Sequence, residues 1–416
     1  MHVVVIGAGV IGVTTAHYLH TAGHQVTLID RRDNAAQESS FANAGLIAPG
    51  HVAPWAAPGM PGQMLRALFR STAPIRLRPG FDAALWRWTR AWLRECAFER
   101  YRANRERMQR LAVYSREQLQ ELRELIGLEY DQHHGHLQLL RTPRDVAAAR
   151  PGLELLAQAG IAHELVDPDR CYALEPGLAR DTPLSAGIWF ANDESGNCAL
   201  FTRRLKSRLA GVGVALRLGE AVTGLAFDPA PRVHLADGSA LGCDAVVVCA
   251  GVDSAALLAP LGVHLPLVAV KGHSITMPVK SFERAPQGAL IDAHHRVAIT
   301  RLGLRMRVSG GAELSGRALA VRPQALNTLW RVVRDWFGPA PDYTCPQLWV
   351  GARPMLPEGL PLLGAGTQRG LYLNLGHGSN GWAMACGSGK IVADLIDGRA
   401  PDMDLSGFTL ADRYPR

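Results

Sequence analysis

The segment HVVVIGAGVIGVTTAHYLHTAGHQVTLID, residues 2–30, decides the fold. Its apolar opening is followed by three glycines, then by an amphipathic stretch, and finally by a second apolar run that ends in Asp30. This order predicts a buried strand, a tight turn, a helix and a second, parallel strand. The spacing of Gly7, Gly9 and Gly12 matches the G-x-G-x-x-G turn of dinucleotide-binding folds.

Each position of this motif has its own physical role. Gly7 permits the tight turn, Gly9 lets a pyrophosphate approach the backbone, and Gly12 lets the helix pack closely on the strand. The N-terminus of the helix offers unpaired N–H groups and a positive dipole end to phosphates. Asp30 can accept hydrogen bonds from ribose hydroxyls. The segment therefore predicts a dinucleotide site, which can take either NAD or FAD.

The residues after Asp30 favour the longer of these two cofactors. Residues 31–62, RRDNAAQESSFANAGLIAPGHVAPWAAPGMPG, form a polar, small-residue stretch and not a further strand–helix unit. Ser39, Ser40, Asn43 and Gly45 offer short side chains and close backbone approach. A loop of this kind suits a cofactor that extends past its phosphates, as a flavin does. A surface loop without a ligand is the alternative.

Composition limits the other classes of function. The chain has 416 residues, 48% hydrophobic and 19% charged, which predicts two domains or one divided domain. The net charge is +7, but its basic residues are dispersed without a run of five, so we expect no nucleic-acid partner and at most a weak attraction to anionic lipid. No apolar run reaches the roughly 20 residues of a membrane span, and the expected location is cytoplasmic.

Cysteine and histidine give no pattern of a metal site. The seven cysteines are scattered and lack a C-x-x-C spacing, which predicts reduced thiols; Cys243 and Cys249 lie in a strand pattern. His133, His134 and His136 follow no ligand spacing, so structural or surface roles are favoured over a metal.

Beyond the first segment, periodicity predicts helices and a second sheet. Residues 85–125 read as two or three helices, with Trp86, Trp88 and Trp92 expected in the core. Residues 192–219 read as a turn, a helix with Leu200, Leu205 and Leu209 facing inward, and a strand. A further helix is predicted near 325–337. The other predicted strands are 134–140, 187–191, 221–227, 232–235, 245–249, 270–277, 288–293, 297–303 and 305–313.

Two C-terminal motifs complete the pattern. WVGARPMLPEGLPLLG spans residues 349–364, and LGHGSNGWAMACGSGK spans residues 375–390 and places a second glycine-rich turn before a helix. With the opening segment and ESSFANAGLIAPGHVAPWAAPG, NDESGNCALFT, VKGHSITMP and VAITRLGLRMRVSGGAEL, they resemble the FAD-dependent D-amino acid oxidase superfamily. Within it the chain is similar to the bacterial D-amino acid dehydrogenases of the small catalytic subunit type.

The resemblance implies an α/β fold in which a Rossmann-like FAD-binding domain is interrupted by an α+β substrate-binding domain. The FAD-binding domain would comprise residues 1–80, 187–265 and 345–416. The substrate domain would comprise a helical part, residues 81–186, and an antiparallel sheet, residues 266–344.

The resemblance also implies the site residues. Arg353 would hold the substrate carboxylate, with His51 or His273 near the flavin ring and His377 in a structural role. N–H groups at residues 378–381 would stabilise negative charge on the ring. The residues expected to contact FAD are Val5, Ile6, Gly7, Ala8, Gly9, Val10, Ile11, Gly12, Asp30, Arg31, Ser39, Ser40, Asn43, Ala44, Gly45, Val222, Ala250, Gly251, Gly376, Gly378, Ser379, Asn380 and Gly381.

The implied reaction is oxidative deamination of a D-amino acid, with hydride transfer to FAD and electrons passed to a quinone or dye instead of oxygen. Peripheral contact with the inner face of the cytoplasmic membrane would follow. Oxidation of glycine, sarcosine or D-hydroxyproline is an alternative in the same superfamily. An NAD-dependent dehydrogenase, a tRNA-modifying enzyme and a non-catalytic flavoprotein subunit are alternatives from other classes.

Overall fold

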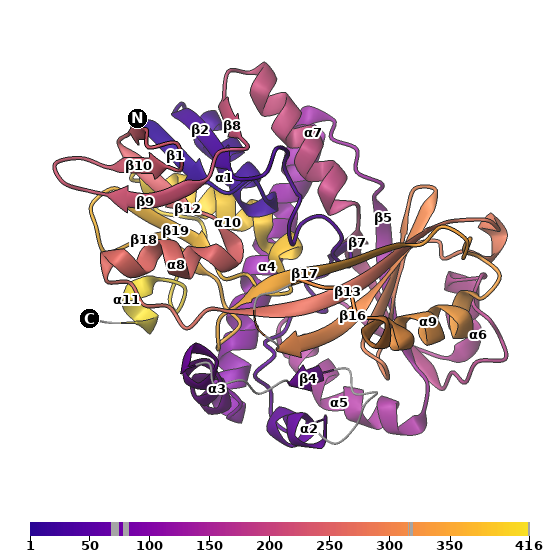
Figure 1. Cartoon of the computed structure of the whole chain (residues 1–416). Helices are drawn as coiled ribbons and strands as arrows, with labels where there is room; N and C mark the ends of the chain where they lie inside the picture. The colour runs from indigo at the N-terminus through magenta and orange to yellow at the C-terminus, as the bar shows by residue number, and fades with distance from the viewer. Residues whose placement is uncertain (68–74, 78–82, 315, 317–318, 415–416) are drawn as a thin grey trace.

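A computed structural model describes residues 1–67, 75–77, 83–314, 316 and 319–414. Two large sheets lie side by side, on the left and right of Figure 1. The predicted domain boundary between residues 80 and 81 lies outside the described residues.

The first sheet contains the opening segment. Its central strand β1 has Val3, Val4 and Val5 fully buried, as expected for a strand that is covered on both faces. Strands β12, β1, β2 and β8 run parallel, β19 extends this set, and β18 closes the edge antiparallel. In sheet order the strands are β18 (Leu362–Ala365), β19 (Leu371–Leu375), β12 (Ala245–Val248), β1 (His2–Ile6), β2 (Gln25–Asp30) and β8 (Ala215–Leu218).

Helices from both ends of the chain cover this sheet. Helix α1 (Val10–Thr21) packs against α10 (Gly381–Ile396), which also packs against the long helix α4 (Phe98–Ile126). Close packing explains two glycines of α10. A Cβ on Gly387 would lie 2.9 Å from Ser115 Cα of α4, and one on Gly389 would lie 3.0 Å from the Thr15 nitrogen of α1.

The second sheet has ten strands and carries the other half of the molecule. Its apolar face packs on α9 (Pro323–Phe337) around Trp336 and Phe337, which are fully buried. In order the strands are β17 (Gln347–Met355), β13 (Val268–Pro278), β16 (Arg305–Leu314), β15 (Val297–Leu302), β14 (Ala289–Asp292), β5 (His133–Leu140), β7 (Ala186–Ser195) and β3 (Leu46–Ile47), with β4 (Ile75–Leu77) and β6 (Glu164–Val166) on its sides.

A small three-stranded sheet stands apart from both large ones. It consists of β11 (Ala240–Gly242), β10 (Arg232–Leu235) and β9 (Val222–Ala226). The remaining α-helices are α2 (Met60–Ala67), α3 (Ala83–Glu95), α5 (Pro143–Gln158), α6 (Pro168–Leu174), α7 (Cys198–Gly211), α8 (Ser254–Leu258) and α11 (Leu410–Arg413).

Most predicted elements are confirmed, and the differences have local reasons. The turn predicted to open residues 192–219 is wrong, because β7 continues to Ser195 through the buried Asp193 and Glu194. Trp88 and Trp92, four residues apart on one face of α3, are buried as predicted, but Trp86 is 63% exposed, because residues two apart in a helix lie on nearly opposite faces. Of the leucines predicted to face inward, Leu205 and Leu209 are buried and Leu200 is half-buried.

Sheet membership divides the chain differently from the predicted segments. β7 lies in the ten-stranded sheet, although residues 187–265 were assigned to the nucleotide domain, and β17 lies there too, although residues 345–416 were assigned to that domain. β9 and β10 form the separate small sheet and do not join the second large one. Among the described residues, no helix is both long and apolar enough to cross a bilayer.

Candidate active site

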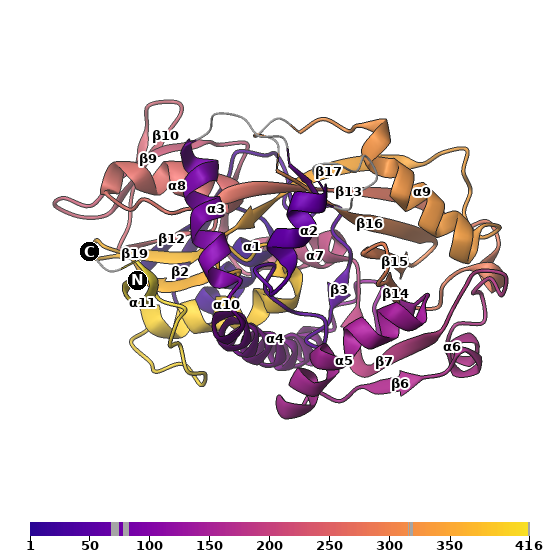
Figure 2. The same ribbon diagram turned by 90° about the horizontal axis from the view of Figure 1, so that it is seen from below.

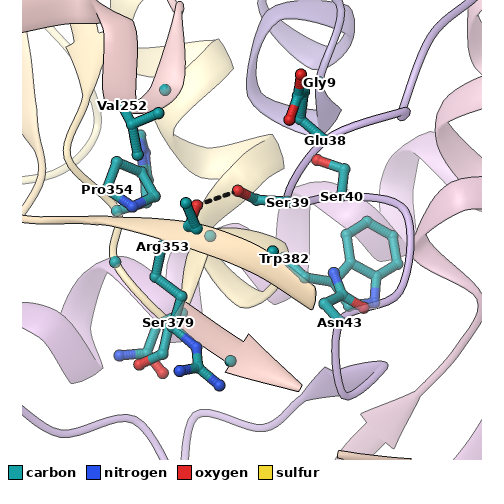
Figure 3. A pocket seen from close by; sticks show the side chains of 18 of the residues that line it. Gly9, Glu38, Ser39, Ser40, Asn43, Val252, Arg353, Pro354, Ser379 and Trp382 are labelled. Carbon is teal, nitrogen blue, oxygen red and sulfur yellow. Dashed lines mark hydrogen bonds between the residues drawn. The ribbon is translucent and has the colours of Figure 1, made fainter. Parts of the chain in front are cut away.

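A cavity of about 1050 Å³ is lined by residues of both large sheets. Figure 3 shows part of its wall, with Gly9, Ser39 and Ser40 on one side and Arg353 with Ser379 on the other. Residues from the start, middle and end of the chain therefore meet around one space.

The nucleotide end of the cavity is built on the first glycine motif. Gly7 has φ +109°, and a Cβ there would lie 2.4 Å from the Cys249 carbonyl oxygen. A Cβ on Gly12 would lie only 1.7 Å from the Gly7 carbonyl oxygen, so both positions require glycine. Helix α1 has no acidic residue in its first turn and no side-chain cap at Gly9. Its positive end is thus left for an anion.

Asp30 lies at the same end, at the terminus of β2. Its Oδ2 accepts the Ala8 N–H at 2.6 Å and its Oδ1 accepts the Arg32 N–H at 2.8 Å. These bonds fix the carboxylate beside the turn while each oxygen keeps a further acceptor site. Arg31 forms ion pairs with Glu38 at 3.1 Å and with Asp253 at 3.0 Å. Acceptors of this kind suit ribose hydroxyls.

The cavity gathers most of the residues that the sequence suggested for cofactor contact. Twenty of them line it, from Ile6 through the loop at Ser39–Gly45 to Gly381. Val5, Ala8 and Gly12 do not line it. Val5 is buried in the sheet, Ala8 directs its N–H to Asp30, and Gly12 faces Gly7. Contact with the cofactor remains a prediction for the others.

The second glycine motif forms the opposite wall of this end. Gly376 and Gly378 have φ +83° and +57°, and Cβ atoms there would lie 2.4 Å from Leu356 Cδ1 and 2.5 Å from Met355 Sδ. Protein packing therefore already requires these glycines, apart from any ligand. The Gly378 N–H donates to Pro354 O and the Asn380 N–H to His377 O, so two of the four expected donors are used internally.

Arg353 projects from β17 into the cavity. Its Nη1 donates to Gly311 O at 2.9 Å and to Lys271 O at 3.4 Å, and its guanidinium lies 5.7 Å from the centre of the Trp55 ring. Burial lowers the pKa of Arg353 to about 10, so it stays charged at neutral pH. Among the described residues, both bonds use Nη1, which leaves the rest of the fork for a carboxylate.

Two of the histidines named in the sequence analysis line the cavity. His51 lies in the loop after β3, and His273 lies on β13, the strand that pairs with β17. His51 is exposed by surface area, but desolvation by the surrounding protein, with the neighbouring His136 and Arg105, lowers its pKa to about 3. Burial lowers the pKa of His273 to about 4. Both rings are therefore neutral at physiological pH and can accept a hydrogen bond without repelling a cation.

His377 differs from these two. Its Nε2 is 3.0 Å from Ser388 Oγ inside α10, and the residue is 3% exposed. Burial lowers its pKa to about 3. A structural role, as the sequence suggested, fits these contacts.

Sequence reasoning missed Trp55. Its indole Nε1 donates to Ser379 Oγ at 3.2 Å, which ties the N-terminal loop to the second glycine motif, and its ring lies against Arg353. The sequence carries no local signal for this role, because its partner Ser379 lies 324 residues further along the chain.

Comparison with known proteins now gives the family. The family profile described as FAD dependent oxidoreductase matches residues 2–395. The chain belongs to this FAD-dependent oxidoreductase family. A D-amino acid dehydrogenase of Rhizorhabdus wittichii is 45% identical over 417 residues, covering 100% of both chains. One of Cereibacter sphaeroides is 46% identical over 419 residues, covering 100% of this chain and 95% of the relative.

Solved structures of the same fold extend the comparison. Glycine oxidase from Geobacillus kaustophilus matches with a TM-score of 0.76 and 20% identity, over 98% of this chain and 97% of that one. L-proline dehydrogenase from P. horikoshii matches with a TM-score of 0.73 and 18% identity, over 98% and 96%. At this identity the likeness establishes the fold of the flavoenzyme.

The cavity fits the family's cofactor. Two helices, α1 and α10, begin at its wall, and neither has an acidic first turn or a side-chain cap. The first would receive the pyrophosphate of FAD at Gly9 and Val10, and the second would face the electron-rich end of the flavin at Ser379 and Gly381. Ser40 Oγ accepts the Val10 N–H at 3.0 Å and orders the loop that would cover the cofactor.

Proposed function

We propose that this flavoenzyme oxidises D-amino acids to 2-oxo acids and ammonia. The observation that carries the proposal is the half-buried guanidinium of Arg353, held against Trp55 in the cavity that both glycine motifs line. A fixed arginine in such a place binds a carboxylate through paired hydrogen bonds. The full-length relatives named D-amino acid dehydrogenase support the same substrate class.

The residues of the chain would bind and orient while the cofactor supplies the redox chemistry. Bound FAD accepts a hydride from carbon. Arg353 anchors the carboxylate, so that the Cα–H of the D-enantiomer points at the cofactor. His51 and His273 are neutral and accept a hydrogen bond from the amine as it releases its proton to solvent water. Loss of the hydride and this proton leaves an imino acid, and water then displaces ammonia to give the 2-oxo acid.

An absorbance experiment tests this function. The purified protein should be yellow, and D-alanine added under nitrogen should bleach its flavin band while L-alanine should not. Bleaching by sarcosine or glycine but not by D-alanine would favour the small-amine alternative. Flavin that no amine bleaches would reject the proposal.

The electron acceptor is proposed to be a membrane quinone. Helices α2 and α3, which face the viewer in Figure 2, share a small core built on Met64 and Trp88. On the outside of α3, Trp86 is 63% exposed and Leu93 is 48% exposed. Among the α3 side chains that the structure describes, residues 84–95, the exposed ones are Ala84, Trp86, Arg87, Arg90, Leu93 and Arg94. Apolar side chains interleaved with arginines favour the surface of an anionic bilayer.

Vesicle sedimentation tests the membrane contact. The protein should sediment with phosphatidylglycerol vesicles at low salt and much less with phosphatidylcholine. Replacing Arg87, Arg90 and Arg94 together by Glu should abolish the difference, because each basic side chain near such a surface contributes about 1 kcal/mol. Equal sedimentation of this triple variant would place the contact elsewhere or remove it.

A further inference from the structure

A buried Asp–His pair lies behind His51. His136 of β5 is 0% exposed and Asp193 of β7 is 2% exposed, and His136 Nδ1 is 3.1 Å from Asp193 Oδ2. Neither residue lines the cavity. The pair is therefore a titratable cluster that the proposed reaction does not use directly.

The local backbone places His136 in this position. The pairing of β5 with β7 shifts register between His134 and His136, a bulge centred on Gly135. Gly135 has φ +78°, and a Cβ there would lie 1.9 Å from the Trp189 ring. After the bulge, His136 is paired with Phe190, and the two rings stack with centres 4.8 Å apart. Bulges of this kind re-aim a side chain.

Asp193 also fixes the backbone beside His51. Its Oδ1 accepts the Gly50 N–H at 3.3 Å. A Cβ on Gly50 would lie 2.4 Å from the Phe190 ring, so the loop is pressed onto β7 at this point. His51 follows directly, and its ring approaches that of His136 edge to face, with centres 5.9 Å apart.

One ring nitrogen of the Asp193–His136 pair, Nε2 of His136, has no hydrogen-bond partner among the described residues. A carboxylate only accepts, so His136 Nδ1 carries the hydrogen that points at Asp193, and Nε2 of a neutral His136 is an acceptor. Among the described residues, His136 Nε2 is buried without a hydrogen-bond partner. A buried polar atom left unpaired is costly, which indicates a partner that arrives during function.

We propose that Asp193 and His136 are positioning residues that orient His51 for the substrate amine. His51 would turn to donate its N–H to His136 Nε2, which leaves its other nitrogen as the acceptor that faces the amine. The chain of acceptors and donors thereby fixes one tautomer of His51. The inference rests on the proposed function, because it gives His51 a hydrogen bond to a D-amino acid.

A double-mutant cycle tests the coupling. Flavin reduction by D-alanine is measured under nitrogen for the wild type, His51→Ala, His136→Phe and the double variant. His51→Ala should slow reduction tenfold or more. His136→Phe keeps the stacking on Phe190 but loses Nε2, and it should slow reduction about tenfold in the wild-type background and less than twofold in His51→Ala. A merely structural role would instead give losses that multiply in the double variant.

Two further variants test whether the acceptor atom of His136, and not its packing on Phe190, causes the loss of rate. His136→Gln, which keeps an acceptor near the place of Nε2, should recover most of the rate lost in His136→Phe. His163→Phe is the matched control, since His163 also lies against Phe190, with ring centres 6.3 Å apart, and should reduce at the wild-type rate. Flavin content should match the wild type throughout, and His136→Phe should lower the melting temperature, because it leaves the buried Asp193 carboxylate without its imidazole partner. If His136→Phe does not fold, Asp193→Asn takes its place in the cycle.

The possible outcomes distinguish the positioning role of Asp193 and His136 from the proposed oxidation of D-amino acids. Wild-type flavin that no D-amino acid bleaches would reject the proposed function itself. A wild type that is bleached, together with multiplicative losses or with a normal rate in His51→Ala or His136→Phe, would overturn the positioning role alone.

Discussion

The two ends of the cavity are built in different ways. At the nucleotide end, Gly7, Gly9 and Asp30 come from one continuous segment of a strand, a turn, a helix and a second strand. At the substrate end, His273 and Arg353 come from the paired strands β13 and β17, and His51 comes from the loop after β3, a strand at the other end of the same ten-stranded sheet. The first end depends on local backbone geometry and the second on long-range register, so substitutions should separate cofactor binding from substrate binding.

Gly12→Ala should have the largest effect, at the nucleotide end. The added Cβ would lie 1.7 Å from the Gly7 carbonyl oxygen, so the turn must move away from its phosphate-binding shape. We expect protein that is purified without flavin or is insoluble, scored by the ratio of flavin to protein absorbance. Gly211→Ala, where a Cβ would meet nothing within 4 Å, is the control and should stay yellow. A yellow, stable Gly12→Ala would remove the local-backbone explanation.

Arg353→Met should come next, and it should leave the cofactor in place. Loss of two charge-assisted hydrogen bonds, at about 1.5–3 kcal/mol each, corresponds to a fall of about 10²–10⁴ in kcat/KM for D-alanine. Flavin content should be unchanged, because Arg353 lies on the other sheet. Arg305→Met alters an exposed arginine of β16 and serves as the control. Unchanged kinetics would take Arg353 out of the substrate site.

Two glycine substitutions in α10 should act differently, one on the stability of the fold and the other on the affinity for FAD. Gly389→Ala would place its Cβ 3.0 Å from backbone atoms of α1 and should lower unfolding stability by about 1–3 kcal/mol. Gly381→Ala has room, with His377 Cβ at 3.4 Å, and should instead weaken FAD binding while the melting temperature of the apoprotein stays unchanged. Calorimetry and flavin titration check the two effects. The opposite assignment would mean that Gly381 serves packing alone.

His377→Gln should have the smallest effect, visible only in acid. The pKa of His377 is about 3 in the folded protein and about 6.5 when unfolded, so the unfolded chain takes up the proton first and stability falls as pH drops below 6.5. Removing this histidine should flatten that fall by up to about 1.4 kcal/mol per pH unit. Urea unfolding at pH 7 and pH 5 measures it, with the exposed His264→Gln as control. Equal slopes would contradict the burial of this ring.

The sequence predicted the nucleotide end well because its chemistry is local. The order of strand, turn and helix can be read from residues 2–30 alone. The alternation of apolar and polar residues predicted most strands of the second sheet. The role of Arg353 came only from resemblance to a family, since one arginine among many has no local signature. The contact between His136 and Asp193 could not be predicted from sequence, because the bulge at Gly135 sets which face of β5 the His136 side chain takes.

The same limit explains the errors. Charged residues at 193 and 194 read as a turn, but ion pairing and hydrogen bonds compensate their burial, as in the bond from Arg123 to Glu194 at 2.9 Å. Contact of Gly376 and Gly378 with the flavin stays a prediction, but sequence alone did not show that Leu356 and Met355 also require glycine at these positions. In both cases a tertiary neighbour, absent from the local pattern, decided the structure.

The packing of α1 on α10 has a consequence for synthesis on the ribosome. The opening βαβ unit is made before its partners, since its central strand needs β12 and β19, and its helix needs α10, which begins only at Gly381. The nascent nucleotide domain must therefore wait, with apolar surface uncovered, until α10 has been synthesised. Chains that terminate prematurely before α10 should be recognised by chaperones or proteases and never acquire the cofactor, so that synthesis of α10 acts as a checkpoint for assembly of the holoenzyme.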